Sequence, residues 1–340
     1  MTRKPVTLRE IAQRLGVHES TVSRALSQRT RHLVAGDVAE RIAATARELG
    51  YRPNAMAASL RTRRSHTVGV VIPDITNPIF PPIIRGIEDT LYAEGLTAIL
   101  VNTGDDPARE VQILANLHAR QVEGLILGTA RETPGESTGD GDPDIPVVLV
   151  NRSGSGGNLS WVVNDDASGI RQAIDHLSGL GHRQIGLLSG PLDVSTGRTR
   201  RAAFEDAMRE AGLDAGAVQD CAAYAITEGR RACDALLDTR PELTALVTAN
   251  DLLALGAYEA LEARGLSCPG DVSVTGFNDM PLVGRLSPPL TTIHVALYEM
   301  GAQAAAILLE RISDPAAPAR RITLPCTLEV RGSTATPRSG

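Results

Sequence analysis

The chain opens with a stretch in which apolar residues recur at the spacing of an α-helix. In VTLREIAQRLG they fall at positions i, i+3, i+4 and i+7 of one face, as Leu8, Ile11, Ala12 and Leu15. Thr7 and Glu10 have the spacing of a capping box, in which the hydroxyl accepts from an otherwise unpaired amide and the carboxylate reaches back. Gly16 is expected to end this helix, because glycine readily adopts the left-handed conformation found at helix ends.

Two more helices are predicted close behind the first. In the segment VHESTVSRALS, helical spacing predicts that Val22, Ala25 and Leu26 are buried. The polar residues are then expected to face outward, and they are Glu19, Ser20, Ser23, Arg24 and Ser27. A turn of about three residues separates the first two helices, as in a helix-turn-helix. A third helix is predicted over 37–49, ending at Gly50, with four apolar residues inward, namely Val38, Ile42, Ala46 and Leu49.

The distribution of charge indicates what this helical head binds. Residues 1–64 carry 13 Lys and Arg against 5 Asp and Glu, a net charge of +8, whereas the other residues carry 21 against 35, a net charge of −14. A basic head on an acidic body indicates that only the head meets a polyanion. The outer side of the second helix suits the major groove of DNA, where Arg can pair with guanine. A small three-helix packing unit with a solvated face is the alternative.

The segment GYRPNAMAASLRTRRSHT behind the third helix is predicted to be only weakly helical. Asn54 can cap a helix of about six residues, which is too short to be stable alone in water. We therefore expect coil until a partner stabilises it. Leu60 lies among Arg61, Arg63 and Arg64, and suits an apolar wedge in the minor groove while the arginines bind phosphate. A plain interdomain linker is the alternative.

From residue 66 onward, short apolar runs alternate with amphipathic helices. The runs are TVGVVIP, LTAILVN, GLILGT, IPVVLVN, QIGLLSG, LTALVTAND and VSVTGFND. Such alternation is typical of parallel sheets covered by helices on both faces, and the number of units indicates two lobes. The predicted fold is therefore an all-α helix-turn-helix head joined to an α/β body of two parallel-sheet lobes.

Polar residues follow nearly every predicted strand. In open parallel sheets, ligands bind beyond the carboxyl ends of the strands. Amides donate and accept, and Asp accepts from hydroxyls, so this edge suits a polyhydroxylated ligand. Each residue could instead cap the helix that follows it. The strand-end residues are Asp74, Asn102, Thr129, Asn151, Ser189, Asn250, Asp251, Asn278 and Asp279.

Composition and motifs argue against other classes. The four Cys are scattered without a C-x-x-C pair, so neither a disulfide framework nor a zinc site is expected. No apolar run reaches the about 20 residues of a membrane span, and the first residues are not a signal peptide. No hydrolase, phosphate-loop or kinase signature appears. We expect a cytoplasmic, nucleoid-associated protein with no cofactor and no enzymatic activity; an enzyme or small-molecule binding protein with an incidental basic head is the alternative.

Several stretches together resemble the lac repressor family of transcription regulators. VTLREIAQRLGVHESTVSRALS, ELGYRPNAMAASLRT and TVGVVIPDITNPIF match in order and spacing, and VTANDLLALGAYEAL, VSVTGFNDM and SPPLTTIHV continue the match. The resemblance implies lobes built like the type I periplasmic sugar-binding proteins, with chain crossings near Asp165 and Thr292. It also implies domain bounds, which are 6–52 for the DNA-binding domain, 53–65 for a hinge helix and linker, and 66–332 for the effector-binding and dimerisation domain. Within that last domain, the expected N-lobe is about 66–165 and 293–322, and the expected C-lobe is about 166–292 and 323–332.

The same resemblance implies functional residues in both parts. Glu19, Ser20 and Arg24 occupy base-reading positions, and Leu60 an intercalating one. The residues expected on DNA are Thr7, Glu19, Ser20, Thr21, Ser23, Arg24, Ser27, Asn54, Ala57, Leu60 and Arg61. Those expected on the effector are Asp74, Phe80, Asn151, Asn164, Arg200, Tyr224, Asn250 and Asn278. His18 replaces the usual Ser cap and the loop over 28–35 is longer than common, so the operator sequence stays open.

The resemblance implies a mechanism. A homodimer would bind palindromic double-stranded operator DNA, and a small polar effector between the lobes, a sugar by first expectation, would control operator affinity. A nucleobase or nucleoside acting as corepressor is the alternative. The weak helix after Pro53 would report the state of the lobes to DNA. No terminal heptad repeat is present, so a dimer rather than a tetramer is expected, and no membrane partner is expected.

Overall fold

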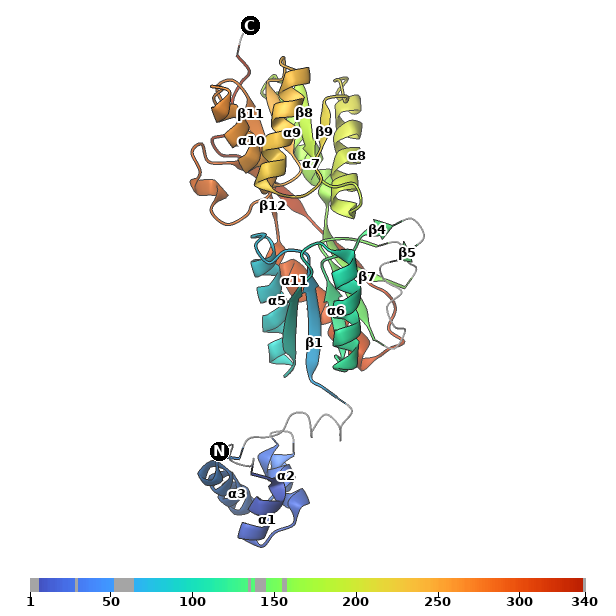
Figure 1. The fold of residues 1–340 in the computed structure, drawn as a ribbon, viewed down its shortest axis with the longest axis vertical. Coiled ribbons are helices and arrows are strands. Elements are labelled where there is room, and N and C mark those ends of the chain that lie inside the picture. The colour runs from blue at the N-terminus through green and yellow to red at the C-terminus, as the bar shows by residue number, and fades with distance from the viewer. Residues whose placement is uncertain are drawn as a thin grey trace. The chain divides into compact units, whose positions relative to one another are not determined.

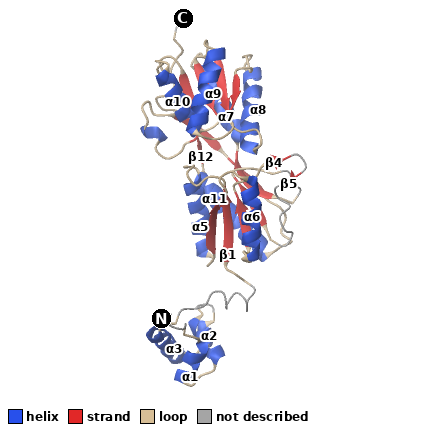
Figure 2. Cartoon of the chain, viewed as in Figure 1, coloured by secondary structure: helices blue, strands red, loops and turns tan. Residues whose placement is uncertain are grey.

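The computed structural model describes residues 6–27, 30–51, 64–133, 136–137, 145–154 and 158–338. The chain divides into two compact units, residues 1–65 and 66–340 (Figure 1). The first unit is helical, and the second contains two six-stranded sheets with helices around them (Figure 2). This confirms the predicted fold class. Among the described residues, no helix is both long and apolar enough to cross a membrane.

The helical head contains α1 (Leu8–Leu15), α2 (Glu19–Leu26), the 3-10 turn η1 (Arg31–Leu33) and α3 (Gly36–Leu49). The capping box is formed, since Thr7 N donates to Glu10 Oε2 at 2.9 Å and Glu10 N to Thr7 Oγ1 at 3.3 Å. The turn η1 was not predicted, and α3 buries Ala39 and Thr45 in place of two residues expected inward, Val38 and Leu49, which are half-buried. The buried core is Ile11, Ala12, Val22, Ala25, Ala39, Ile42 and Ala46.

The first sheet of the body has the order β13-β7-β6-β3-β1-β2, with all neighbouring strands parallel. Helices cover both faces, with α5 and α11 packed on one core and α6 on the other. A two-stranded hairpin, β4 (Glu132–Thr133) and β5 (Glu136–Ser137), lies outside it. The elements are β1 (Thr67–Ile72), α5 (Phe80–Ala93), β2 (Thr97–Asn102), α6 (Pro107–Ala119), β3 (Gly124–Leu127), β6 (Val147–Val150), β7 (Ser160–Asn164), α11 (Leu297–Ser313) and β13 (Arg321–Leu324).

The second sheet has the order β14-β12-β11-β10-β8-β9, and only β14 is antiparallel to its neighbour. Its central strands are fully buried, as expected of a sheet with both faces covered. The elements are α7 (Asp166–Gly179), β8 (Ile185–Ser189), α8 (Ser195–Glu210), β9 (Val218–Asp220), α9 (Ile226–Thr239), β10 (Ala245–Thr248), α10 (Asp251–Ala263), β11 (Ser273–Asn278), η2 (Val283–Arg285), β12 (Thr291–Val295) and β14 (Cys326–Glu329).

The chain passes between the two lobes three times. It leaves the first sheet after Asn164, returns to the first lobe after Val295, and crosses again between Leu324 and Cys326. The last two crossings lie a few residues beyond the bounds expected from the sequence, because β12 and β13 each complete their pairing before the chain leaves the lobe. We propose these three crossings as the lobe bounds.

Each lobe has a pair of outer helices whose backbones touch at glycines. A Cβ on Gly86 of α5 or Gly301 of α11 would lie 2.1 or 2.0 Å from a carbonyl oxygen of the opposite helix. In the second lobe, a Cβ on Gly229 of α9 or Gly256 of α10 would lie 2.4 or 2.1 Å from such an oxygen. Because backbone atoms cannot move aside as a side chain can, any larger residue at these positions would separate the helices.

The segment after β14 continues the second lobe beyond the end expected at residue 332. Ser333 is fully buried, and its Oγ donates to the carbonyl of Val274 at 2.6 Å and accepts from Thr291 N at 2.8 Å. The Ala335 carbonyl lies 2.8 Å from Nε2 of the buried His182. This tail therefore stabilises the second sheet at its amino-terminal side, a role that its polar composition did not suggest.

The contacts of the tail predict a pH dependence of stability. Burial lowers the pKa of His182 below its ordinary value of 6.5, although the Ala335 carbonyl opposes this. Below about pH 6.5, His182 binds a proton more readily in the unfolded chain than in the folded one, so its contribution to the free energy of unfolding should fall as the pH drops through this range. Buried carboxyls with a raised pKa, such as Asp251, contribute in the opposite direction, so each variant is compared with the wild type. Urea titrations at pH 7.5 and 5.5 would measure the free energy of unfolding. From pH 7.5 to 5.5, His182→Gln should lose less stability than the wild type, whereas His118→Gln, on the exposed side of α6, should change as the wild type does.

Candidate functional site

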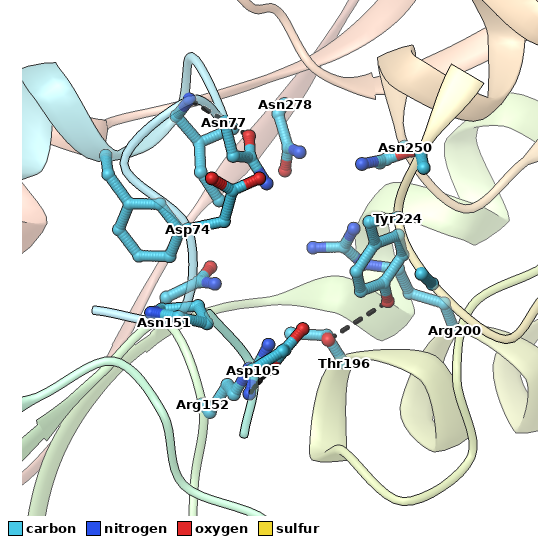
Figure 3. Close-up of a pocket in the computed structure, with 15 residues that line it drawn as sticks. Asp74, Asn77, Asp105, Asn151, Arg152, Thr196, Arg200, Tyr224, Asn250 and Asn278 are labelled. Atoms are coloured by element: carbon cyan, nitrogen blue, oxygen red, sulfur yellow. Dashed lines mark hydrogen bonds and ion pairs between the residues drawn. The ribbon is translucent and has the colours of Figure 1, made fainter. Parts of the chain in front are cut away.

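A pocket lies between the two lobes of the body, where strands of both sheets end (Figure 3). It contains about 650 Å³ of space free of protein atoms, its open mouth included. The first lobe supplies the loops after β1, β2 and β6, and the second supplies the loops after β8, β9, β10 and β11. The lining residues are Pro73, Asp74, Asn77, Ile79, Phe80, Asp105, Asn151, Arg152, Thr196, Arg200, Ala223, Tyr224, Ala225, Asn250 and Asn278.

Seven of the eight residues expected on an effector line this pocket, and Asn164 does not. Those that line it are Asp74, Phe80, Asn151, Arg200, Tyr224, Asn250 and Asn278. Asn164 is buried at the first chain crossing, and neither amide atom has a hydrogen-bond partner in the part of the chain that the structure describes. Figure 3 shows Asp74 and Asn77 of the first lobe facing Asn278 of the second.

Other strand-end residues form local hydrogen bonds instead. Asn102 Oδ1 accepts from Ile75 N at 2.9 Å, and Thr129 Oγ1 donates to Glu110 Oε1 at 2.6 Å. Asn250 combines both expected roles, since it lines the pocket while its Oδ1 caps α10 by accepting from Leu253 N at 2.9 Å. The amide nitrogen of Asn250 therefore remains for a ligand.

Asp251 is a structural residue rather than a lining one. Its side chain is fully buried, and its two carboxylate oxygens accept from Thr292 Oγ1 at 2.5 Å and from Met280 N at 2.7 Å. Burial raises the pKa of Asp251 to about 7, even though these hydrogen bonds oppose the change. The carboxylate thus joins the start of α10 to β12, the strand that leads to the second crossing. Asp279 is likewise held by an ion pair to Arg331 at 2.7 Å.

Arg200 of α8 is held rigidly in the wall of the pocket. Its Nε and Nη2 donate to Asp166 Oδ1 at 3.1 and 2.8 Å, and its Nη1 donates to the Ala249 carbonyl. The guanidinium also stacks 3.7 Å from the ring centre of Phe277. Burial lowers the pKa of Arg200, but the carboxylate of Asp166 and the nearby Tyr224 and Cys326 together outweigh burial, and the pKa is raised. The group stays charged and can offer its remaining N–H donors to a ligand.

Arg152 is a second lining arginine, which the sequence reasoning missed. It is 5 % exposed, its Nη1 donates to the Thr129 carbonyl at 3.3 Å, and the nearest carboxylate oxygen, on Asp105, is 3.9 Å away. Its Nε has no hydrogen-bond partner among the described residues. Burial lowers the pKa of this guanidinium. The signal available was its position directly after Asn151, whose φ of 65° ends β6 and turns the chain along the pocket.

Tyr224 depends on a glycine behind its ring. The hydroxyl of Tyr224 donates to Thr196 Oγ1 at 3.0 Å, as Figure 3 shows. A Cβ on Gly190 would lie 2.3 Å from that hydroxyl and 2.5 Å from the ring. Gly190→Ala should therefore displace the tyrosine and weaken ligand binding by about tenfold, in line with the loss of one hydrogen bond and part of an apolar contact. Titration calorimetry would measure the loss. An affinity equal to that of the wild type would mean that Tyr224 does not contact the ligand.

The side of α2 that was predicted to face outward is the exposed side in the structure. Glu19, Ser20 and Arg24 are exposed, and Thr21, Ser23 and Ser27 are half-buried. His18 serves as the N-cap of α2 in place of a serine, because its Nδ1 accepts from Ser20 N at 3.2 Å. Ser20 Oγ lies 2.8 Å from the same Nδ1, so this hydroxyl already has a local partner. Thr7 is exposed at the start of α1.

Four residues expected on DNA lie outside the described residues. They belong to the segment after Tyr51 and are Asn54, Ala57, Leu60 and Arg61.

Comparisons with known proteins match both units. The model of bacterial regulatory proteins of the lacI family matches residues 7–54, and that of a periplasmic binding protein-like domain matches residues 174–334. The ribose operon repressor of Escherichia coli (strain K12) is 31 % identical over 329 residues, which are 96 % of this chain and 99 % of that protein. The alignment thus spans nearly the whole of both chains.

Two solved structures share the fold. The lac repressor dimer bound to operator and the anti-inducer ONPF is 27 % identical, with a TM-score of 0.84 over 98 % of this chain and all of that one. A regulator from Enterococcus faecium with bound ribose is 32 % identical, with a TM-score of 0.70 over 80 % of this chain and all of that one.

Proposed function

This chain belongs to the lacI family of bacterial regulatory proteins, and from that premise we propose that it is a homodimeric repressor whose operator affinity is controlled by a neutral monosaccharide. Members of the family act on transcription and are not enzymes. The observation that carries the proposal is the convergence of amides, carboxylates and arginines from both lobes on one pocket. A ligand held by both lobes can change their relative position, because it stabilises the arrangement in which both sets of contacts form.

The hydrogen-bonding groups of the pocket favour a polyhydroxylated ligand. The lining amides of Asn77, Asn151 and Asn278 can each donate to and accept from a hydroxyl. The carboxylate of Asp74 already accepts from Thr76 and can accept from a ligand hydroxyl as well. The ring of Tyr224 offers an apolar face for the C–H side of a sugar. The Enterococcus faecium regulator, which shares this fold, holds ribose.

The charges of the pocket argue against a phosphorylated ligand. Arg200 is paired with Asp166 at 2.8 Å, and Arg152 lies 3.9 Å from the Asp105 carboxylate, so each arginine has an acidic neighbour. Asp74 adds a further negative charge to the lining. A phosphate would bring about −2 charges beside these carboxylates, which is unfavourable in a partly buried site.

A thermal-shift comparison of four compounds tests the effector class. D-ribose should raise the melting temperature of the full-length protein, because a ligand that binds only the folded state stabilises it by mass action. D-ribose 5-phosphate should give no shift. The melting-temperature shift with D-glucose, compared with that with D-ribose, measures how far the pocket selects a pentose over a hexose. A shift by hypoxanthine with none by either sugar would contradict the sugar proposal in favour of a nucleobase.

Selection from a pool of random duplexes tests the DNA-binding part. Palindromic sequences should be enriched, because two identical heads related by two-fold symmetry read two identical half-sites. The affinity for the selected operator should fall linearly with salt concentration on logarithmic axes, as phosphate contacts release counterions. A weak, salt-dependent affinity without sequence enrichment would contradict sequence-specific binding.

A further inference from the structure

Beside the pocket, one arginine joins the two lobes. Arg131 follows β3 in the first lobe, and its Nη2 donates to the Asp105 carboxylate at 2.7 Å and to the Asp105 carbonyl at 3.2 Å. Its Nη1 forms an ion pair with Asp193, in the loop before α8 of the second lobe. A neighbouring hydrogen bond also crosses between the lobes, from Ser153 N to Ser195 Oγ at 2.9 Å.

The bridge reaches the pocket through Asp105. This residue lines the pocket, and its Oδ1 accepts from Arg131, which leaves Oδ2 for a ligand hydroxyl. Its φ of 60° lies in the left-handed region, which a non-glycine residue adopts only when its surroundings stabilise it. The backbone N–H of Asp105 donates to the Pro73 carbonyl at 3.1 Å and to Thr103 Oγ1 at 3.2 Å. The two hydrogen bonds from Arg131 add to this support, because one holds the Asp105 carbonyl and the other holds the carboxylate.

We propose that Arg131 is a positioning residue of the effector site, which holds Asp105 in the pocket wall and, through Asp193, holds the second lobe against the first. This inference rests on the proposed function, because it gives Arg131 a role in effector binding. Pairing with Asp105 and Asp193 at once requires arginine, since a planar guanidinium can donate to two acidic partners in fixed directions, whereas lysine offers a single point charge. Closed lobes and a fixed Asp105 would both strengthen effector binding.

Asp193→Asn tests the bridge without changing a residue that lines the pocket. With D-ribose as the probe and the full-length protein, calorimetry should give an affinity about two- to fivefold below that of the wild type, the effect of a partly exposed ion pair. Asp214→Asn is the matched control. Asp214 pairs with Arg240 at 2.7 Å within the second lobe, at a similar exposure, so its removal should leave the affinity unchanged.

Variants of Arg131 separate positioning from a general structural role. Arg131→Met should lose more affinity than Asp193→Asn, because Asp105 also loses its support. Arg131→Lys should recover part of that loss. In Arg131→Met the added Asp193→Asn substitution should cost nothing further, since the pair is already broken. Additive losses in the double variant would contradict the bridge.

Amide exchange gives a measurement that does not depend on the ligand. In Asp193→Asn without ligand, the peptide containing Ser153 should exchange faster than in the wild type, because the cross-lobe hydrogen bond opens more often. It should not change in Asp214→Asn. Equal exchange in the wild type and Asp193→Asn would overturn the proposal for Arg131. Failure of D-ribose to bind the wild type would instead overturn the proposed effector class, and the exchange experiment would still decide the bridge.

Discussion

Arg24→Ala should reduce affinity for the selected operator by roughly 5- to 150-fold, the equivalent of about 1–3 kcal/mol for a bidentate contact to a guanine. Arg24 is exposed on α2, while its neighbours Val22 and Ala25 are buried in the core of the head. The substitution therefore removes a surface group and should leave the helix and its packing intact. Fluorescence anisotropy with labelled operator would measure the change.

Two comparisons show whether Arg24 reads a base or only binds phosphate. Arg24→Lys keeps the charge but loses the planar fork, so a base-reading arginine should not be rescued by it. Arg41→Ala, at an exposed position of α3, is the matched control. If Arg24→Ala weakened binding equally on operator and on random DNA, and the salt slope fell by about one, the contact would be to phosphate.

Arg200→Met should abolish the response to the effector and also destabilise the body by about 3–5 kcal/mol. Asp166 is 7 % exposed and would lose the cation that compensates its burial. Burial already raises the pKa of Asp166 and Arg200 opposes that rise, so without Arg200 the carboxyl would tend to be protonated. Urea unfolding would measure the stability, and operator release by D-ribose would measure the response.

The double variant Asp166→Asn with Arg200→Met separates these two effects. An asparagine needs no counter-charge, so the double variant should regain most of the stability lost in the single variant. It should still fail to respond to the effector, because the lining arginine is absent. Restored release of operator by D-ribose in the double variant would show that Arg200 acts only by supporting the fold.

The helices and strands could be predicted because their patterns are local. Apolar residues at helical spacing predicted the helices of the head, and short apolar runs predicted the parallel strands of the body. The turn η1 and the tail around Ser333 were missed. The placement of the tail depends on contacts with distant residues such as Val274 and Thr291, for which a single sequence carries no local sign. The turn η1 has no side-chain cap that a sequence pattern could have indicated.

The pocket could be predicted in outline, because strand ends of parallel sheets meet at one edge. Its lining depends on how the chain turns after each strand. Asn151 has a φ of 65° and Asp105 one of 60°, and these turns bring Arg152 and Asp105 to the pocket, where sequence reasoning did not expect them. Asn164 also ends a strand, yet does not line the pocket. The polar type of a residue is readable from sequence, but its direction is not.

The glycine contacts limit how regulation can work in this molecule. Helices whose backbones touch cannot slide past one another, so α5 with α11, and α9 with α10, should resist shear within each lobe. Motion is then confined to the three connecting segments after Asn164, Val295 and Leu324, about which each lobe would rotate as a rigid body. Substitutions that alter regulation while sparing ligand affinity should accordingly concentrate at these connections and not along the helices.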